Sequence, residues 1–267
     1  MLKLYTHLKN MSIYSQVLIV HAILYITVFL TLVFAFDWQL LLAGIAVGWL
    51  LFCIGGSISL HRYTCHRTFE PKNRIIKLLL LWAGVQCTLG SVPGFSAAHR
   101  HHHKNSDTNK DPFKLTDSFW HNFKLWIYHF PPVSFSPRSI VDLIGDNDIK
   151  FSHTHYWKIW AIVPALVLLS AGPIYFAYFI AVPIVYVIMG MGYVTVISHS
   201  PTWKKWTGGT AIYETNDTSW DSKLFTLLYV GEGFHHSHHA SQGTFDYSIK
   251  GQQFDLSGFI IRRLKKD

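Results

Sequence analysis

The chain has 267 residues, of which 50% are hydrophobic and only 14% are charged. Average soluble domains carry about 25% charged residues, so this composition predicts an integral membrane protein and argues against a soluble one. The formal net charge of +8 at pH 7 is compatible with nucleic-acid binding. However, two long stretches contain no lysine or arginine. This distribution predicts a lipid bilayer as partner and argues against nucleic acid.

The two stretches without lysine or arginine cover residues 10–61 and 159–203. Each is long enough for two membrane-spanning helices, because one span needs about 20 apolar residues. Asp37 interrupts the first stretch and Gly172 the second, as expected of tight turns between paired spans. We therefore expect four spans, at approximately residues 16–36, 39–60, 155–170 and 174–197.

The positive-inside rule places the lysines and arginines, and with them both termini, on the cytoplasmic side. The apolar segment at residues 75–92 contains Lys77 and ends in Gly, Ser and Val, which predicts a helix in the membrane interface or beside the spans and not a fifth span. The expected fold class is all-α. We predict a single membrane domain over residues 1–267, with four transmembrane helices in two hairpins and a cytoplasmic histidine-rich cap.

Histidines gather at the predicted cytoplasmic ends of the spans. The second span ends in "HRYTCH", which contains His61 and His66, and the fourth ends in "TVISHSP", which contains His199. Two further segments carry "HRHHH" at 99–103 and "HHSHH" at 235–239. Four segments that are distant in sequence thus bring imidazoles to one face of the membrane, which predicts a shared site there.

Helical spacing selects the candidate ligands. Positions i, i+3 and i+4 share a face of an α-helix, so each HxxHH motif directs three histidines to one point and leaves His101 and His236 off that face. His61 and His66 are about 140° apart around an α-helix, so we expect the helix to fray or bend there. The nine candidate metal ligands are His61, His66, His99, His102, His103, His199, His235, His238 and His239.

Nine imidazoles are too many for one ion and suit two. Imidazole alone leaves the metal open, because zinc, copper, iron and nickel all accept it. The Glu-x-x-His pairs of soluble di-iron bundles are missing, which excludes that class. The alternative is a histidine-rich surface that buffers metal without a defined site. The repeated HxxHH pattern and the positions at span ends favour a defined site.

The order and spacing of these motifs resemble the membrane-bound fatty acid desaturases, particularly their delta-9 acyl-CoA and acyl-lipid branch. That family carries HxxxxH, HxxHH and a second HxxHH, with an extra histidine at the end of the fourth span. Here "HRYTCH", "HRHHHKNSDTNKDP" and "GEGFHHSHHASQGTFDYS" match those motifs. The resemblance covers nearly the whole chain, including the spans and the order of the boxes.

The resemblance implies two iron ions (Fe2+/Fe3+) held by the nine histidines, with O2 as co-substrate. It implies an oxidoreductase that inserts a cis double bond, at the delta-9 position, into a saturated fatty acyl chain. The acyl carrier would be CoA, acyl-carrier protein or a lipid, and the uncharged "SAAH" before the second box argues against CoA. Thr195 stands where the family carries an Asn that holds a metal-bound water, and we expect its hydroxyl to take a similar role.

The chain has no room for the fused cytochrome domain of some relatives, so the resemblance implies a separate electron donor such as ferredoxin or cytochrome b5. An acidic carrier of this kind would dock on basic residues of the cytoplasmic face. The candidates are Lys104, Lys110, Lys204 and Lys205.

Two other functions share some of these features. A membrane di-iron hydroxylase of fatty acyl or alkyl chains has similar boxes, usually with one fewer residue inside the first, so "HRYTCH" favours a desaturase. A non-catalytic membrane metal-binding or transport protein would place ionisable groups near the middle of its spans. Here all but His21 and Asp37 lie toward the span ends, which argues against transport.

Overall fold

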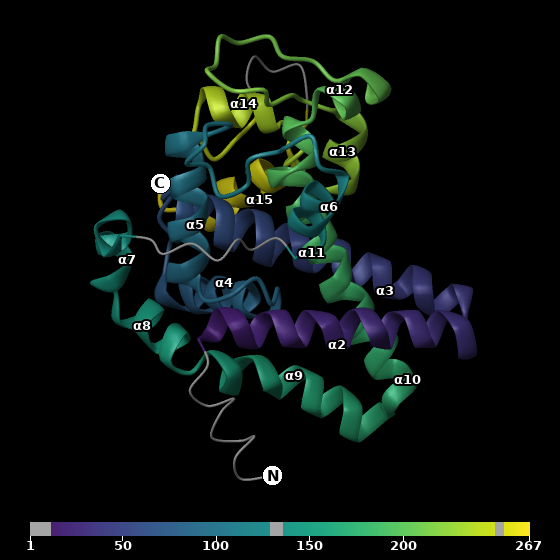
Figure 1. Cartoon of the computed structure of the whole chain (residues 1–267). Coiled ribbons are helices and arrows are strands. Elements are labelled where there is room, and N and C mark those ends of the chain that lie inside the picture. Colours follow the sequence, from purple (N-terminus) through teal and green to yellow (C-terminus); the bar gives the residue numbers. More distant parts are fainter. Residues whose placement is uncertain (1–11, 129–135, 249–253) are drawn as a thin grey trace.

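The computed structural model describes residues 12–128, 136–248 and 254–267. Every regular element in these residues is a helix, which confirms the expected all-helical class, and Figure 1 shows the long apolar helices below the short helix that carries the last histidine motif. The α-helices are α2 (Ile13–Phe34), α3 (Trp38–Leu51), α4 (Arg74–Gln86), α5 (Val92–Asn105), α6 (Phe119–Tyr128), α7 (Val141–Ile144), α8 (Asn147–Thr154), α9 (Tyr156–Ala171), α10 (Pro173–Phe176), α11 (Val182–Thr195), α12 (Pro201–Thr207), α13 (Lys223–Leu228), α14 (His235–Ala240) and α15 (Leu256–Leu264). The π-helices are η1 (Phe52–Cys65) and η3 (Ala177–Ala181), and the 3₁₀ helices are η2 (Pro137–Ile140) and η4 (Ile197–His199).

Three helical segments within the described residues are long and apolar enough to cross a membrane, namely Ile13–Phe34, Trp38–Cys65 and Pro173–His199. They correspond to three of the four predicted spans. The remaining predicted span, 155–170, corresponds to α9, which is apolar but has only 16 residues. At 1.5 Å per residue α9 is about 24 Å long, shorter than a hydrocarbon core of about 30 Å.

The turns within the two predicted hairpins lie at the same end of the molecule. The α2–α3 turn and the α9–α10 turn are both on the right of Figure 1, away from α14. The Tyr178 hydroxyl ties the first turn to η3, because it donates to the Ala35 carbonyl at 2.8 Å and accepts from the Asp37 N–H at 2.7 Å. The Asp37 carboxylate caps α3 by accepting from the N–H groups of Gln39 and Leu40.

Small residues allow α3 and the Pro173–His199 segment to pack closely. A Cβ atom added at Gly44 would lie 2.2 Å from the Tyr178 carbonyl oxygen, and one added at Gly48 would lie 2.9 Å from the Tyr186 Cβ. Glycines four residues apart are a common device for close helix packing in membranes. This contact fixes the two helical segments that carry His61 and His199 near their C-terminal ends.

The second predicted span does not end at residue 60 and does not fray. It continues to Cys65, and its last part, η1, is wound as a π-helix. The N–H of His66 donates to the carbonyl of His61 at 3.0 Å, which is the i→i+5 bond of this winding. Residues five apart are therefore close to one turn apart, so both histidines face the same side of an intact helix.

The apolar segment predicted as a helix over 75–92 is shorter than expected. Helix α4 ends at Gln86 because Thr88 and Gly90 adopt positive φ angles of 58° and 86°, which no right-handed helix accommodates. The chain then turns into α5 at Val92. Helix α4 packs against η1, buries Leu80 and Leu81 and leaves Ile75 exposed. This arrangement fits the predicted place beside the spans.

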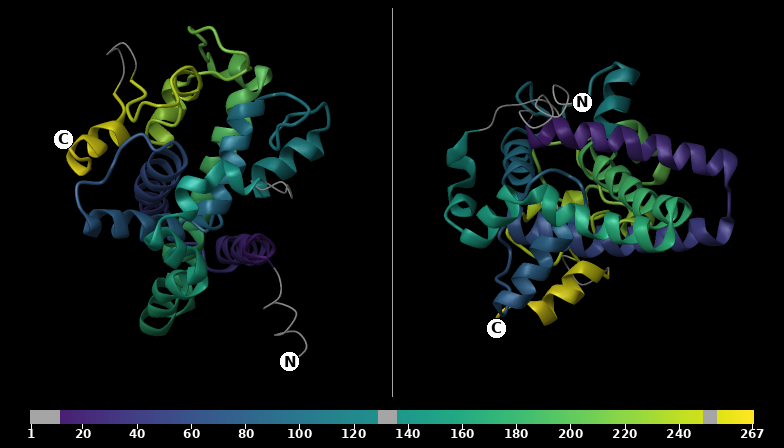
Figure 2. Two further views of the ribbon diagram at one scale, coloured as in Figure 1. Left: turned by 90° about the vertical axis from the view of Figure 1, so that its left-hand side faces the viewer. Right: turned by 90° about the horizontal axis from the view of Figure 1, so that it is seen from below.

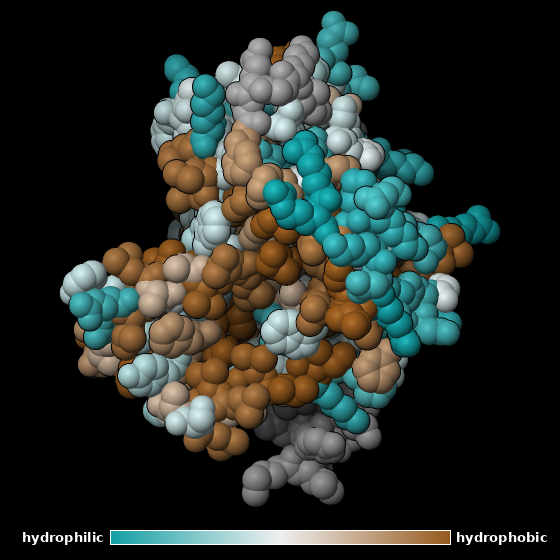
Figure 3. Space-filling model, turned by 180° about the vertical axis from the view of Figure 1, so that it is seen from behind, coloured by the Kyte–Doolittle hydropathy of each residue, from teal (hydrophilic) through white to brown (hydrophobic). Residues whose placement is uncertain are grey.

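Apolar side chains also cover the outside of the long helices. Phe29 of α2, Ile75 of α4 and Leu169 of α9 are 65%, 70% and 85% exposed. In the right-hand view of Figure 2, the axes of α2, α3 and α9 run lengthwise and nearly parallel to one another. Figure 3 shows apolar residues over the middle and lower left of the rear face and hydrophilic residues along its right side. An apolar surface of this extent is typical of contact with a membrane.

Candidate metal centre

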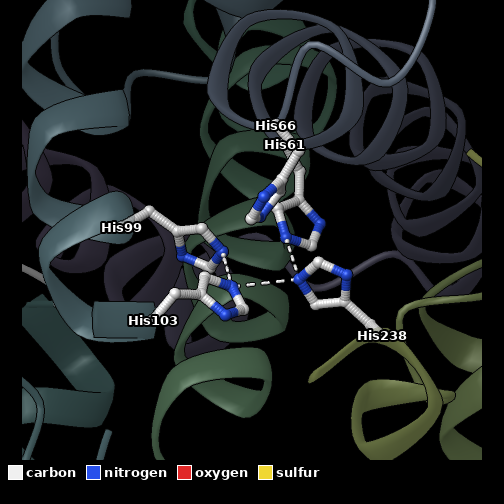
Figure 4. A group of neighbouring side chains, drawn as sticks. All are labelled: His61, His66, His99, His103 and His238. Atoms are coloured by element: carbon white, nitrogen blue, oxygen red, sulfur yellow. Dashed lines mark hydrogen bonds between the residues drawn. The ribbon is translucent and has the colours of Figure 1, made fainter. Parts of the chain in front are cut away.

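The nine histidines predicted as ligands converge in two neighbouring groups, in each of which the ring nitrogens that face one another lie within 4.8 Å. Figure 4 shows the larger group, with side chains from η1, α5 and α14 pointing toward one centre. The five-histidine group is His61, His66, His99, His103 and His238, and the four-histidine group is His102, His199, His235 and His239.

Each HxxHH motif contributes to both groups. In α5, His99 and His103 belong to the five-histidine group and His102 to the four-histidine group. In α14 the assignment is reversed, because His238 belongs to the five-histidine group and His235 and His239 belong to the four-histidine group. The expectation that each motif directs three histidines to one point is therefore wrong. Positions i and i+4 are about 40° apart around a helix, whereas i+3 and i+4 are about 100° apart, so they can serve two adjacent centres.

The distances between Nε2 atoms match those between metal ligands. The Nε2 of His103 lies 2.9 Å from that of His99 and 3.0 Å from that of His238, which lies 3.1 Å from the Nε2 of His61. Two nitrogen ligands at right angles around an ion, with bonds of about 2.1 Å, are about 3.0 Å apart. The five-histidine group thus has the geometry of a coordination shell.

The four-histidine group shows the same feature. The Nε2 atoms of His199 and His235 lie 3.0 Å apart. The Nε2 atoms of His102 and His239 are buried and have no hydrogen-bond partner among the described residues. A buried polar atom without a partner is costly, and coordination of a cation would satisfy both nitrogens.

Four of the nine imidazoles are held by carboxylates through Nδ1. An Nδ1–H that donates to a carboxylate leaves the Nε2 lone pair free to face a metal, and this arrangement is usual for metal-bound histidines. The pairs are His61–Glu232 at 2.7 Å, His102–Asp111 at 2.9 Å, His199–Asp107 at 3.3 Å and His239–Asp217 at 2.7 Å.

The charge states also suit a cation. Burial, followed by repulsion from neighbouring imidazoles, lowers the pKa of His99, His103 and His235 well below its usual value, so these rings are neutral as metal ligands must be. The pKa of the Asp107 carboxyl is lowered to about 2. Burial alone would raise this pKa, but the hydrogen bonds from His199 and Thr218 lower it by more. Neutral imidazoles backed by ionised carboxylates leave negative charge near both groups, and the residues fit two metal ions.

The remaining residues singled out in the sequence lie outside both groups. The Nε2–H of His101 donates to the Lys110 carbonyl at 3.0 Å, and the Nε2 of His236 accepts from the Tyr213 N–H at 3.0 Å. Thr195 is buried at the end of α11, where its hydroxyl donates to the Met191 carbonyl at 3.0 Å.

Sequence reasoning missed the four carboxylates that hold Nδ1 atoms. Glu232 lies three residues before His235, and Asp107 and Asp111 lie in the "NSDTNKDP" run that follows the second box. These three were near enough to the motifs to be considered as hydrogen-bond partners of the ligands. Asp217 has no such signal, because it reaches His239 from a loop after α12.

Comparison with known proteins identifies the family. The fatty acid desaturase family model matches residues 13–245, which include all nine histidines. The chain belongs to the fatty acid desaturase family. It is therefore an oxidoreductase, and the histidine groups fit the histidine boxes of such desaturases.

Individual desaturases resemble the chain along most of its length. The sn-1 stearoyl-lipid 9-desaturase of Anabaena variabilis is 26% identical over 231 residues, covering 86% of this chain and 82% of that protein. A chloroplastic palmitoyl-monogalactosyldiacylglycerol delta-7 desaturase of Arabidopsis thaliana is 24% identical over 243 residues, covering 87% of this chain and 61% of that protein. An acyl-CoA C20 Delta5-desaturase of Anemone leveillei is 25% identical over 222 residues, covering 79% of this chain and 66% of that protein.

Proposed function

We propose that this desaturase uses O2 and two iron ions to insert a cis double bond at the delta-9 position of a saturated acyl chain. The observation that carries the proposal is the pair of buried histidine groups, with five and four members. One iron ion would be held by each group. When bound, iron would supply the redox chemistry that removal of hydrogen from unactivated methylene groups requires.

The chain's own residues orient the ligands and keep water out. His235 and His238 are fully buried, and His102 is 1% exposed, so bulk water does not reach these rings. The four carboxylates fix the Nδ1 atoms of His61, His102, His199 and His239 as donors and hold those ring planes. We propose that Thr195 uses the acceptor side of its hydroxyl to position a water near the four-histidine group, since its proton is directed to the Met191 carbonyl.

The acyl carrier and the bond position are inferred from two observations. The relatives act, by their names, on lipid-bound chains at position 9 or delta-7 and on a CoA-bound chain at Delta5. The segment before His99, "SAA", is uncharged and buried. We propose a lipid-bound chain as substrate, because no charged residue at this position would meet a CoA phosphate, and delta-9 as position.

Electrons would come from a separate carrier such as ferredoxin or cytochrome b5. Lys104, Lys110 and Lys205 are exposed and Lys204 is half-buried, on segments that adjoin the histidine groups. A basic surface of this kind would attract an acidic carrier and hold it within reach of the metals.

We propose four spans in two hairpins within one membrane domain, with the histidine-rich cap and both termini in the cytoplasm. Helix α9 would cross as the third span in chain order, because its exposed apolar side chains Leu166 and Leu169 need lipid and it leads directly into α10. Local thinning of the bilayer would accommodate the short length of α9. The N-terminus, residues 1–11, lies outside the described residues. Reporter fusions at each terminus test the topology, and an external C-terminus would contradict it.

Expression in a host without its own desaturase tests the activity. We expect a new delta-9 monounsaturated fatty acid in total lipids, with the double bond located by mass spectrometry. His102→Ala should give none, and His101→Ala serves as the matched control from the same helix. A hydroxylated fatty acid, or no new product from folded, iron-loaded protein, would contradict the proposal.

A further inference from the structure

A buried arginine connects the metal centre to the C-terminal segment. Arg62, next to His61 in η1, is 0% exposed. Its Nη1 donates to Asp255 Oδ1 at 3.2 Å, and its Nη2 lies 3.1 Å from Asp255 Oδ2 and 3.3 Å from Glu232 Oε1. The guanidinium also stacks on Tyr247, 3.9 Å from the ring centroid. Arg62 thus joins the carboxylate that holds His61 to a carboxylate from the far end of the chain.

Asp255 is itself firmly placed. It is the N-cap of α15, where it accepts from the Gly258 N–H at 3.1 Å, and it also accepts from the Tyr247 N–H at 2.9 Å. The other end of α15 is tied to the segment after η1, because the Lys72 N–H donates to the Leu264 carbonyl at 2.8 Å. Helix α15 therefore forms a fixed support that packs against η1.

The balance of charge explains why a second carboxylate is needed. Glu232 directs Oε2 to the Nδ1 of His61 at 2.7 Å and Oε1 to Arg62. With Asp255 present, the single positive charge of Arg62 is shared by two carboxylates, and one negative charge remains to act on His61. Without the Asp255 charge, Arg62 would pair with Glu232 alone, because a buried charge needs a partner. The hold of Glu232 on His61 would then weaken.

We propose that Asp255 is a positioning residue for the metal centre: through Arg62 and Glu232 it orients His61 and sets the metal affinity of the five-histidine group. The segment around α15 would then contribute to the metal site. This inference rests on the proposed two-metal site, but it concerns metal binding alone and is tested without turnover.

The test is a Co2+ titration of the metal-free full-length chain, followed by visible absorption, in which His61→Ala identifies the signal of the five-histidine site. Asp255→Asn keeps a good N-cap residue but removes the charge. We expect about tenfold weaker binding at the five-histidine site and less than a twofold change at the other, since loss of outer hydrogen-bond partners typically weakens metal binding about 10- to 100-fold. Asp246→Asn is the matched control, because Asp246 pairs with Arg262 of the same helix at the surface.

A double-variant cycle separates positioning from general support. Because Asp255 acts through Glu232, Asp255→Asn should weaken binding little further in a Glu232→Gln background. Arg62→Lys is the second single variant, because lysine keeps the charge but cannot bridge two carboxylates, and it should weaken the same site. Unchanged binding in the folded single variants, equal weakening of both sites, or a full additional effect in the Glu232→Gln background would overturn the inference. Fewer than two ions in the wild type would overturn the two-metal site, and this inference with it.

Discussion

The hydrogen bond between Asp111 and His102 predicts how a substitution of Asp111 affects metal binding at the four-histidine group. The Asp111 side chain is buried, and its Oδ1 accepts from the Nδ1 of His102 at 2.9 Å and from the Phe113 N–H at 2.9 Å. Its Oδ2 accepts from the Asp107 N–H at 2.8 Å. Asp111→Asn keeps the shape but offers one acceptor oxygen instead of two. Whichever way the amide is turned, its NH2 group faces a buried N–H donor.

The magnitude follows from these contacts. An unpaired buried donor costs about 1–3 kcal/mol. Outer partners of metal-bound histidines typically contribute about 10- to 100-fold in metal affinity, or about 1.4–2.7 kcal/mol. We therefore expect Asp111→Asn to weaken binding at the four-histidine group about 10- to 100-fold, to leave the five-histidine group nearly unchanged, and to lower product formation in proportion to iron content.

Metal content after purification and competition with a chelator measure the effect. The matched control is Asp117→Asn, which changes an exposed aspartate in the segment that follows. A folded Asp111→Asn protein that holds both ions as tightly as the wild type would show that the carboxylate does not support His102 as a ligand.

Further predictions concern single residues and the metal. His102→Ala should lose metal and product, whereas His101→Ala should keep most of both, and equal metal loss in the two variants would contradict the ligand assignment. Thr195→Val should lower turnover more than thermal stability, and unchanged turnover would rule out a role for the hydroxyl. Gly48→Leu should destabilise the fold by about 1–3 kcal/mol or more through overpacking, as measured by thermal unfolding in detergent; wild-type stability would mean that α3 does not pack as described. Protein filled with zinc should be inactive because zinc has no redox chemistry, and full activity with zinc and no iron would refute oxidative desaturation.

The parts of the fold that the sequence predicted are those that local pattern encodes. The stretches without lysine or arginine and the turn residues Asp37 and Gly172 located the apolar helices to within a few residues. The HxxHH spacing predicted which histidines of α5 and α14 gather in the two histidine groups and which, such as His101, lie outside them. These features depend on residues within one helix, where geometry follows directly from spacing.

The parts that the sequence did not predict depend on more than one segment. Spacing in α5 does not tell which of two adjacent centres His102 faces, because this is decided by where α11 and α14 lie. The π-helical winding of η1 has no sequence rule comparable to the α-helical period. The sequence therefore predicted a frayed or bent helix as the reason why His61 and His66 face the same site. Asp217 and the Arg62–Asp255 pair join residues far apart in the chain, and such partners are chosen by packing.

We propose that the nine histidines hold two iron ions in neighbouring groups. Anomalous X-ray scattering at the iron edge from crystals of the iron-loaded protein would locate these ions. We expect two peaks, one about 2.1 Å from the Nε2 atoms of the five-histidine group and one at the same distance from those of the four-histidine group. A single peak, or iron bound away from these nitrogens, would contradict this proposal.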